Sequence, residues 1–441
     1  MLETTTPTRA PWLDDRPGPK HLHHGTHRAT SLEETHRRLA PMLHRHGVTR
    51  IADITGLDLL GIPVATAVRP NSRSLSVSQG KGLSWEASWA SAAMEAIEHD
   101  HAERPRLPLH LECTVDLDRV VEPWRLPRPP GHSIDPEQPL LWVPGARVAD
   151  GAPVSVPFEA VSLDLTLPRS FLAGGIHRDS NGLAGGNTHL EAVLHALCEL
   201  VERDAAALWD LRCSSKQAAT RIDAATVTDA QAQWMLSAFA TAGVEVALFD
   251  ITSDIGLPTV LCHTVDAEPD PIRPLPPAAG MGAHPVAEVA LQRAMTEAAQ
   301  SRLIAISGAR DDLTRAEFAA SLDVGAAVEL RDALRATAAH ARPWNPQCGQ
   351  RNDNLAADLD WLLAGLRRAG LAEPVAVDLT RPDTQIPVVA VVVPDLEGPG
   401  SVTGAETEPG PRARALAPAH HSEASATAGL DGPNPTDTEE A

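Results

Sequence analysis

The sequence predicts a mixed α/β (α+β) protein built as one large domain. Strand and helix patterns alternate through the middle of the 441-residue chain, and 43% of the residues are hydrophobic, which is enough for a substantial core. Three helical segments also resemble one another and carry acidic residues on an otherwise apolar face. We therefore expect pseudo-repeated helices that carry glutamate pairs and pack against β-sheet.

The two ends of the chain differ in composition from its middle. Residues 1–27 are rich in Pro, Gly and His and predict a flexible segment, whose histidines are more typical of a solvated tail than of a metal site. Residues 399–441 are rich in Pro, Gly, Ala, Thr and acidic residues, and they predict a disordered tail because they can bury little apolar surface. The folded domain is expected over residues 28–398.

The elements of the domain follow in order. Residues 30–47 predict a helix that begins near Ser31 and has Glu33 or Glu34 in its first turn. Residues 51–70 predict two strands around a Gly-containing turn. The remaining predicted elements are a helix at 356–370 and strands at 244–252, 258–266, 374–380 and 388–393. The last strand is far too short to span a bilayer.

Three further helices share one pattern. They lie at 86–100, 190–204 and 287–302, and each carries a glutamate followed three positions later by a second polar residue. The matched pairs are Glu95 and Glu98, Glu199 and Glu202, and Glu297 and Gln300. Residues three apart lie on one face of a helix, and the same faces hold Ser91, Glu191 and Arg293.

The repetition changes how these carboxylates are interpreted. One isolated pair is usually solvent-exposed, but three pairs flanked by Ala, Met, Leu and Val favour burial. Buried carboxylates cannot stay ionised without compensation, and Mg²⁺ takes carboxylate oxygens together with phosphate oxygens. A di-iron centre would require a Glu-x-x-His motif on two helices, but the residues three positions after Glu95, Glu199 and Glu297 are Glu, Glu and Gln. Magnesium with a phosphate ligand is therefore favoured over iron.

The loops before these helices favour the same ligand. SVSQGKG at 76–82 offers Gly80, Gly82 and the cation Lys81, although its spacing is not that of a P-loop. The loop before the second helix is also rich in glycine and ends near Asn187. Arg69 and Arg73 lie just upstream of Lys81, and we expect such local cations to mark the position of an anion.

Composition also argues against several classes of ligand and against several cellular locations. The net charge of −21 argues against nonspecific binding to nucleic acid or to an anionic membrane. The five cysteines include no C-x-x-C pair, so neither a disulfide framework nor a zinc knuckle is indicated. No apolar targeting segment is found at the N-terminus. A cytoplasmic protein is expected, and a homodimer is compatible with the sequence.

Several of these blocks together resemble the YcaO superfamily. The resemblance covers about residues 28–397, and its blocks are GKG with 91–99, then 180–205, 296–303 and 378–397. It implies a YcaO-like fold that binds ATP through Mg²⁺ held by helix glutamates. The glutamates so assigned are Glu95, Glu98, Glu199 and Glu202. The resemblance implies nucleotide contacts at Asn187, Glu191 and Arg203, and at Arg28 and Thr35 near the N-terminus. We add Lys81 to the nucleotide site from its position in the loop, and Ser91 and Arg293 from their positions on the helix faces.

The resemblance also implies an activity. Members of the superfamily activate a peptide backbone amide by phosphorylating its oxygen, and the nucleophile decides the product. The stretch 378–397 resembles stand-alone members that act with a TfuA-like partner in thioamidation, with Asp395 in place of a glycine. Thioamide formation is therefore favoured, with azoline or macroamidine formation as alternatives and a non-catalytic ATP-binding docking subunit as a third. No catalytic nucleophile is singled out, since Cys198 reads as a core residue.

Overall fold

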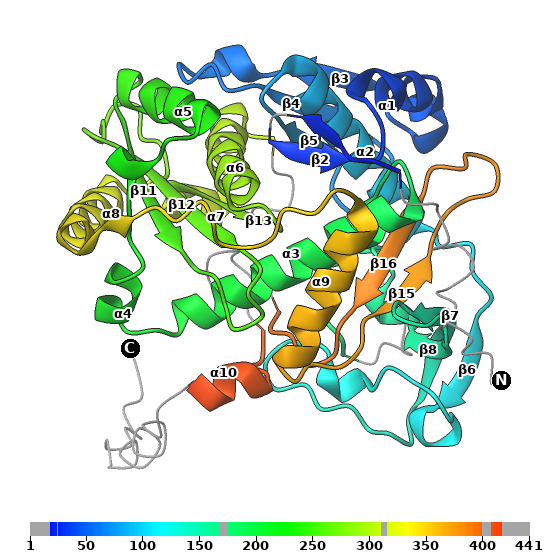
Figure 1. The fold of residues 1–441 in the computed structure, drawn as a ribbon. Helices are drawn as coiled ribbons and strands as arrows, with labels where there is room; N and C mark the ends of the chain where they lie inside the picture. The colour runs from blue at the N-terminus through cyan, green and yellow to red at the C-terminus, as the bar shows by residue number, and fades with distance from the viewer. Residues whose placement is uncertain (1–17, 24, 167–174, 310–314, 399–406, 417–441) are drawn as a thin grey trace, which may run out of the picture.

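The computed structural model confirms a mixed fold of helices and sheets in one body (Figure 1). It describes residues 18–23, 25–166, 175–309, 315–398 and 407–416. The long helix α3 (His189–Asp210) crosses the middle of the molecule, and the other elements gather around it. Within the described residues, no helix combines the length and apolar character needed to cross a membrane.

The first structural unit is a three-stranded antiparallel sheet covered by a helix. Its strands are β3 (Arg50–Asp53), β4 (Val64–Val68) and β5 (Val77–Lys81). Helix α2 (Trp85–Glu103) begins where the Ser84 side chain accepts a hydrogen bond from the backbone N–H of Ala87, a capping arrangement that the sequence encodes locally. Helix α1 (Leu32–Leu39) packs beside α2 and is capped by Ser31, as expected.

A second unit repeats this architecture later in the chain. Its strands are β11 (Val244–Asp250), β12 (Thr259–Asp266) and β13 (Ala278–Ala283), again antiparallel, and its helix is α6 (Ala287–Ser307). Glycines allow the close contact in both units. A Cβ at Gly80 or at Gly280 would lie 2.1 Å from the backbone nitrogen of the facing helix. The predicted helical repeat is thus part of a larger sheet-and-helix repeat.

The third sheet supports the central helix. Its strands run in the order β6 (His110–Cys113), β7 (Pro139–Arg147), β15 (Val375–Asp378), β16 (Val388–Val392) and β9 (Leu183–Gly185), with β8 (Pro153–Pro157) also paired to β7. Helix α3 packs on β16 and β9, and helix α9 (Leu355–Arg368) packs on α3. Leu197 and Val201 of α3 are fully buried in the resulting apolar cluster.

The remaining regular elements lie around these units. They are the strands β1 (His21–His23), β2 (Thr26–Arg28), β10 (Ile222–Asp223) and β14 (Arg342–Pro343), and the helices α4 (Ser214–Ala218), α5 (Ala230–Thr241), α7 (Arg315–Ser321), α8 (Val324–Thr337) and α10 (Pro411–Leu416). The second half of the segment predicted as helix at 30–47 is a 3-10 helix over Ala40–His46.

Two expectations about the ends differ from the structure. Near the end of the segment predicted to be flexible, β1 (residues 21–23) pairs with β2 (residues 26–28) as antiparallel strands. Within the predicted disordered tail, α10 packs on α3, where Arg412 lies 3.0 Å from the buried carboxylate of Asp204. Composition cannot reveal a single buried acidic partner elsewhere in the chain. Residues 1–17, 399–406 and 417–441 of these two segments lie outside the described residues.

Asp395 occupies a backbone conformation that favours glycine. Its φ is 70°, and a non-glycine residue in this left-handed region is strained. The Asp395 carboxylate pairs with the guanidinium of Arg125, which also donates to it from Nε at 3.1 Å. The backbone conformation explains why a glycine is expected at this position. In this chain, the ion pair with Arg125 stabilises Asp395 in that conformation.

Candidate functional site

A cavity of about 400 Å³ lies between the hairpin β1–β2 and the helices α1, α2, α3 and α6. Strand β5 closes one side of it. Every site residue proposed from the sequence lines this cavity, namely Arg28, Thr35, Lys81, Ser91, Glu95, Glu98, Asn187, Glu191, Glu199, Glu202, Arg203 and Arg293. The structure therefore brings together residues that are as far apart in the chain as the first strands and α6.

Helix α2 contributes the first carboxylate pair. Glu95 accepts a hydrogen bond from the backbone N–H of Gln79 at 3.3 Å, and Glu98 accepts one from Gly185 at 2.5 Å. Burial, together with the charge of the neighbouring Glu98, raises the pKa of Glu95 to about 8. Burial also raises the pKa of Glu98 to about 7. Lys81 opposes the shift at Glu95 and Arg28 opposes the shift at Glu98, but both pKa values stay above the ordinary value.

Helix α3 contributes the second pair. Burial raises the pKa of Glu199 to about 8, and its side chain accepts no hydrogen bond from the described residues. Glu202 accepts a hydrogen bond from the backbone N–H of Ala283 at 2.7 Å. Burial, followed by the nearby charge of Glu297, raises the pKa of Glu202. The pair thus faces the same electrostatic problem as the pair on α2.

Glu297 completes the set and was not among the proposed site residues. It lines the cavity from α6 and forms an ion pair with the ammonium of Lys81. Burial alone would raise the pKa of Glu297, but Lys81 and Arg203 more than offset this and hold the pKa below its ordinary value. The alignment of the three helices had already matched Glu297 to Glu95, so the signal was present in the sequence.

The repeat extends to the hydrogen bonds that hold these side chains. Glu95 accepts from the backbone N–H of Gln79, and Glu297 accepts from that of Met281 at 3.2 Å; in both cases the donor lies 16 residues earlier. Both donors are in the strand that packs on the glutamate's own helix. The two sheet-and-helix units therefore present their glutamates to the cavity in the same way.

Positive charge lies on the other walls of the cavity. Arg203 projects from α3 and Arg293 from α6, and the Nε atoms of both are buried without a hydrogen-bond partner among the described residues. Such buried donors normally have an acceptor. Burial lowers the pKa of Arg28, although Glu191 at 3.6 Å opposes the shift. The cavity thus offers unmatched donors for an anion.

The end of the cavity near α1 is held by a hydrogen-bond chain. Thr35 donates from Oγ1 to the side-chain oxygen of Asn187 at 2.9 Å, and Asn187 donates to Glu191 at 3.1 Å. Glu191 also accepts from the backbone N–H of Ala29 at 2.7 Å, which ties the N-terminal segment to α3. This end is fixed by neutral and charged hydrogen bonds rather than by free carboxylates.

The residues present fit a magnesium ion with phosphate oxygens. Several buried carboxylates with raised pKa values would be stabilised in their charged form by a divalent cation. The unpartnered guanidinium donors and Lys81 would meet phosphate oxygens. The donor set consists mainly of oxygen ligands, and the lining residues that offer a nitrogen or sulfur ligand are His99, His195 and Met94. This composition suits a hard cation.

Two expectations about neighbouring residues have different outcomes. Cys198 is buried in the apolar cluster, and burial raises the pKa of its thiol to about 12, which agrees with a core role. Arg69 and Arg73, expected to mark an anion, do not line this cavity. Arg69 pairs with Glu103 at 2.6 Å, and Arg73 pairs with Asp164, so sequence proximity to Lys81 was misleading.

A family model described as YcaO cyclodehydratase, ATP- and Mg²⁺-binding, matches residues 79–397. A protein of Rhizobium leguminosarum bv. trifolii, described as an uncharacterized protein in the tfuA 3′ region, is 37% identical over 382 residues. That match covers 84% of this chain and 88% of the relative.

Solved structures share the fold. YcaO from Methanopyrus kandleri, bound with AMPPCP and Mg²⁺, has a TM-score of 0.67 at 22% identity and covers 86% of this chain and 95% of its own. A heterocyclase in complex with substrate and cofactor has a TM-score of 0.69 at 21% identity; the match covers 88% of this chain but 55% of the heterocyclase.

Proposed function

The chain belongs to the YcaO family, whose members bind ATP and Mg²⁺, and from this premise we propose that it phosphorylates a peptide backbone amide oxygen and converts the amide to a thioamide. The observation that carries the proposal is the cavity in which carboxylates from α2, α3 and α6 face arginine nitrogens that have no hydrogen-bond partner in the described part of the chain. The relative from the tfuA 3′ region supports a TfuA-like partner and a separate sulfide source.

The difficulty in this reaction is the amide oxygen, which is a poor leaving group. ATP with Mg²⁺ would supply the phosphoryl group that makes this oxygen a good one. Sulfide adds to the amide carbon, and the C–O bond then breaks so that the oxygen leaves within inorganic phosphate. One sulfur replaces one oxygen, and ATP is converted to ADP.

The residues of the cavity divide this work. The proposed metal ligands are the glutamates Glu95, Glu98, Glu199 and Glu202, with Glu297 as an addition from the structure. Lys81, Arg203 and Arg293 would face phosphate oxygens and offset the negative charge that develops during transfer. Arg28, Thr35, Ser91, Asn187 and Glu191 would position the nucleotide.

Azoline formation is the second candidate, and the family model's description as a cyclodehydratase favours it. In that reaction a neighbouring Cys, Ser or Thr side chain of the peptide replaces sulfide as the nucleophile. The proposed metal and phosphate contacts would be the same for both reactions, since they differ only at the atom that attacks the amide carbon. The product therefore has to be identified chemically.

Mass spectrometry separates the candidates. The purified chain is incubated with Mg²⁺, ATP, sulfide, a TfuA-like protein and a candidate peptide, and the peptide is weighed. A gain of about 16 Da means exchange of oxygen for sulfur and supports thioamidation, whereas a loss of about 18 Da means cyclodehydration. A docking role without chemistry predicts an unchanged peptide and no ATP turnover, and this result would overturn the proposal.

A further inference from the structure

A second cavity, of about 630 Å³, lies on the far side of α2 from the nucleotide cavity. Asp100 and Glu103 line it, and Asp100 lies two positions after Glu98, about 200° around the helix. The segment just before β9 also contacts both cavities, because Arg178 lines the second cavity and Ser180 lines the nucleotide cavity. The two cavities thus share a helix and a loop as walls.

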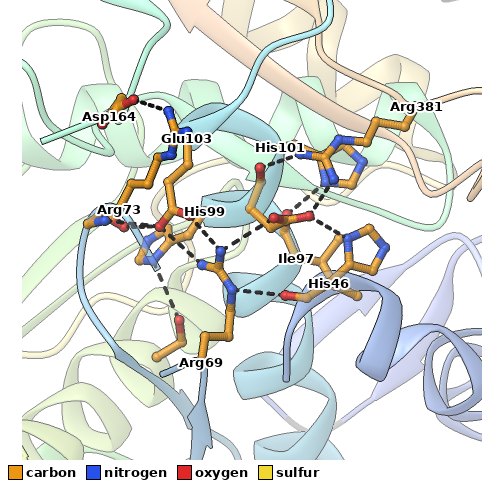
Figure 2. A network of polar contacts seen from close by, with 12 residues as sticks. His46, Arg69, Arg73, Ile97, His99, His101, Glu103, Asp164 and Arg381 are labelled. Atoms are coloured by element: carbon orange, nitrogen blue, oxygen red, sulfur yellow. Dashed lines mark hydrogen bonds and ion pairs between the residues drawn. The ribbon is translucent and has the colours of Figure 1, made fainter. Parts of the chain in front are cut away.

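Charged side chains that line this second cavity belong to a network of ion pairs, part of which Figure 2 shows. Arg381 pairs with Asp100, and Arg73 pairs with Asp164. Glu103 is held by Arg69 at 2.6 Å, and nearby Glu159 is held by Arg178 at 3.0 Å. All four acidic residues of the lining, Asp100, Glu103, Glu159 and Asp164, therefore already have arginine partners.

Three further arginines line the cavity and do not pair with its acidic lining residues, namely Arg45, Arg104 and Arg106. Arg104 is exposed at the end of α2 and has no hydrogen-bond or ion-pair partner among the described residues. Arg45 reaches only the backbone oxygen of Asp383, at 3.5 Å, and Arg106 pairs with the same residue at 3.3 Å across an exposed surface. In a chain of net charge −21, this surplus of positive charge at one rim favours an acidic ligand.

Part of the lining of this cavity is apolar. It is formed by Leu140, Leu141, Pro157, Phe158 and Ile176. Leu141 of β7 lies opposite Leu111 of β6, whose side chain is 51% exposed. Strand β6 pairs only with β7 among the described strands, so an apolar surface follows a strand edge away from the cavity.

We propose that this arginine-rimmed cavity binds an acidic segment of the peptide substrate, with carboxylates at Arg104 and its neighbours and apolar side chains on Leu141 and Leu111. This inference rests on the proposed function, which makes the bound peptide the substrate. It adds a recognition site for peptide that is separate from the nucleotide cavity. A site of mixed character, apolar on one wall and cationic on the rim, suits an extended peptide in which acidic and apolar residues alternate.

Fluorescence anisotropy tests the proposal without ATP. The probes are short fluorescein-labelled peptides with alternating Glu and Leu, alternating Lys and Leu, or alternating Glu and Ser. We expect the Glu–Leu peptide to bind best, the Glu–Ser peptide more weakly and the Lys–Leu peptide not measurably. Equal binding of the Glu–Leu and Lys–Leu peptides would overturn the proposal, and so would binding of inorganic phosphate alone with the same dependence on Arg104.

Exposed variants locate the binding and should fold normally. Arg104→Glu should weaken Glu–Leu binding about tenfold or more, whereas Arg273→Glu, the same change at a side chain that is 87% exposed, should change it less than about twofold. Leu111→Ser should weaken the same peptide, with Leu59→Ser at 85% exposure as its control. Equal effects of the test variants and their controls would refute the assignment.

A nucleotide titration separates this inference from the proposed function. Arg104→Glu should retain the wild-type affinity for Mg²⁺ with ATP, because Arg104 does not line the nucleotide cavity. Loss of nucleotide binding in that variant would count against two separate sites. Failure of the wild-type chain to bind nucleotide would overturn the proposed function and leave the peptide measurement standing.

Discussion

At the scale of single residues, Glu199 is the carboxylate of the glutamate set that the protein stabilises least by hydrogen bonds. It accepts no hydrogen bond from the described residues, while Glu95, Glu98, Glu202 and Glu297 each accept one from a backbone N–H. Burial raises its pKa to about 8, and the guanidinium of Arg203 only partly opposes the shift. A bound cation would therefore stabilise this carboxylate more than the protein itself does.

Glu199→Gln tests this role directly. We expect ATP turnover to fall at least about a hundredfold, because a neutral amide is a poor ligand for Mg²⁺. The free energy of unfolding should be unchanged or slightly higher, because the variant removes an uncompensated buried carboxyl. Coupled-enzyme ATPase assays and thermal unfolding measure the two effects. The control is Glu86→Gln, at an exposed position in the first turn of α2; wild-type turnover in Glu199→Gln would refute the assignment.

The raised carboxyl pKa values also predict a pH dependence. Glu95, Glu98 and Glu199 have pKa values of about 8, 7 and 8 in the folded chain, against an ordinary value of 4.5. Between these values the folded chain binds more protons than the unfolded chain, so its stability without metal should fall as the pH rises from about 5 to about 8. Metal ligands must be deprotonated, so the affinity for Mg²⁺ should rise over the same range.

Thermal unfolding at several pH values measures both trends. The increase in Tm caused by Mg²⁺ with ATP should be larger at pH 8 than at pH 6. Glu199→Gln should reduce the loss of stability with rising pH, because one of the three titrating groups is gone. A larger Tm increase at pH 6 than at pH 8 would contradict the interpretation of the carboxylates as metal ligands.

At the scale of elements, the site depends on how closely each sheet approaches its helix. The backbone of β5 touches α2 at Gly80, and this contact positions both the Gln79 N–H beneath Glu95 and the Lys81 side chain in the cavity. The corresponding contact at Gly280 serves α6. The glycines thus determine where the glutamates of both units lie, without touching a ligand.

Gly80→Ala should separate β5 from α2. The added Cβ would lie 2.1 Å from Ser88 O, and relief of this clash should cost about 2–4 kcal/mol of stability and reduce nucleotide affinity. Chemical denaturation and a nucleotide titration report the two effects. Gly56→Ala is the matched control, because no heavy atom lies within 4 Å of the added Cβ; equal stability of the two variants would exclude a role for close packing.

Helices and buried strands could be predicted from periodicity, and the site from the repetition of glutamates. The sequence could not reveal that Lys81 pairs with Glu297 across the cavity, because that contact depends on how two distant units meet. Arg69 and Arg73 were misassigned for the same reason: their acidic partners lie in α2 and at residue 164, and local sequence does not identify them. Short-range rules describe elements well and long-range pairing poorly.

At the scale of the whole molecule, the end of the described chain stabilises its centre. Asp204 of α3 is fully buried, and burial raises its pKa to about 6 despite Arg412 at 3.0 Å. Glu397, also buried, accepts hydrogen bonds from the backbone N–H groups of Gly410 and Ala413. Helix α10 therefore satisfies two acidic side chains that its removal would leave buried without those partners.

Two truncations test the contribution of α10. Ending the chain after residue 398 should lower the stability by about 3 kcal/mol or more, because a buried charge loses its partner. Ending it after Leu416 keeps α10 and should leave the stability unchanged. Denaturation of both proteins provides the comparison, and equal stability of the two would mean that α10 is dispensable.

The ion pair between Lys81 and Glu297 has a consequence for how ligand is acquired. The Glu297 carboxylate already pairs with the Lys81 ammonium, so a phosphate that binds Lys81 as proposed would have to displace Glu297. Nucleotide binding would then exchange one anion for another at Lys81, instead of adding an anion to an unpaired ammonium. Because one anion replaces another beside Lys81, the number of ion pairs at the lysine does not change on binding. The affinity for the nucleotide should therefore depend only weakly on ionic strength.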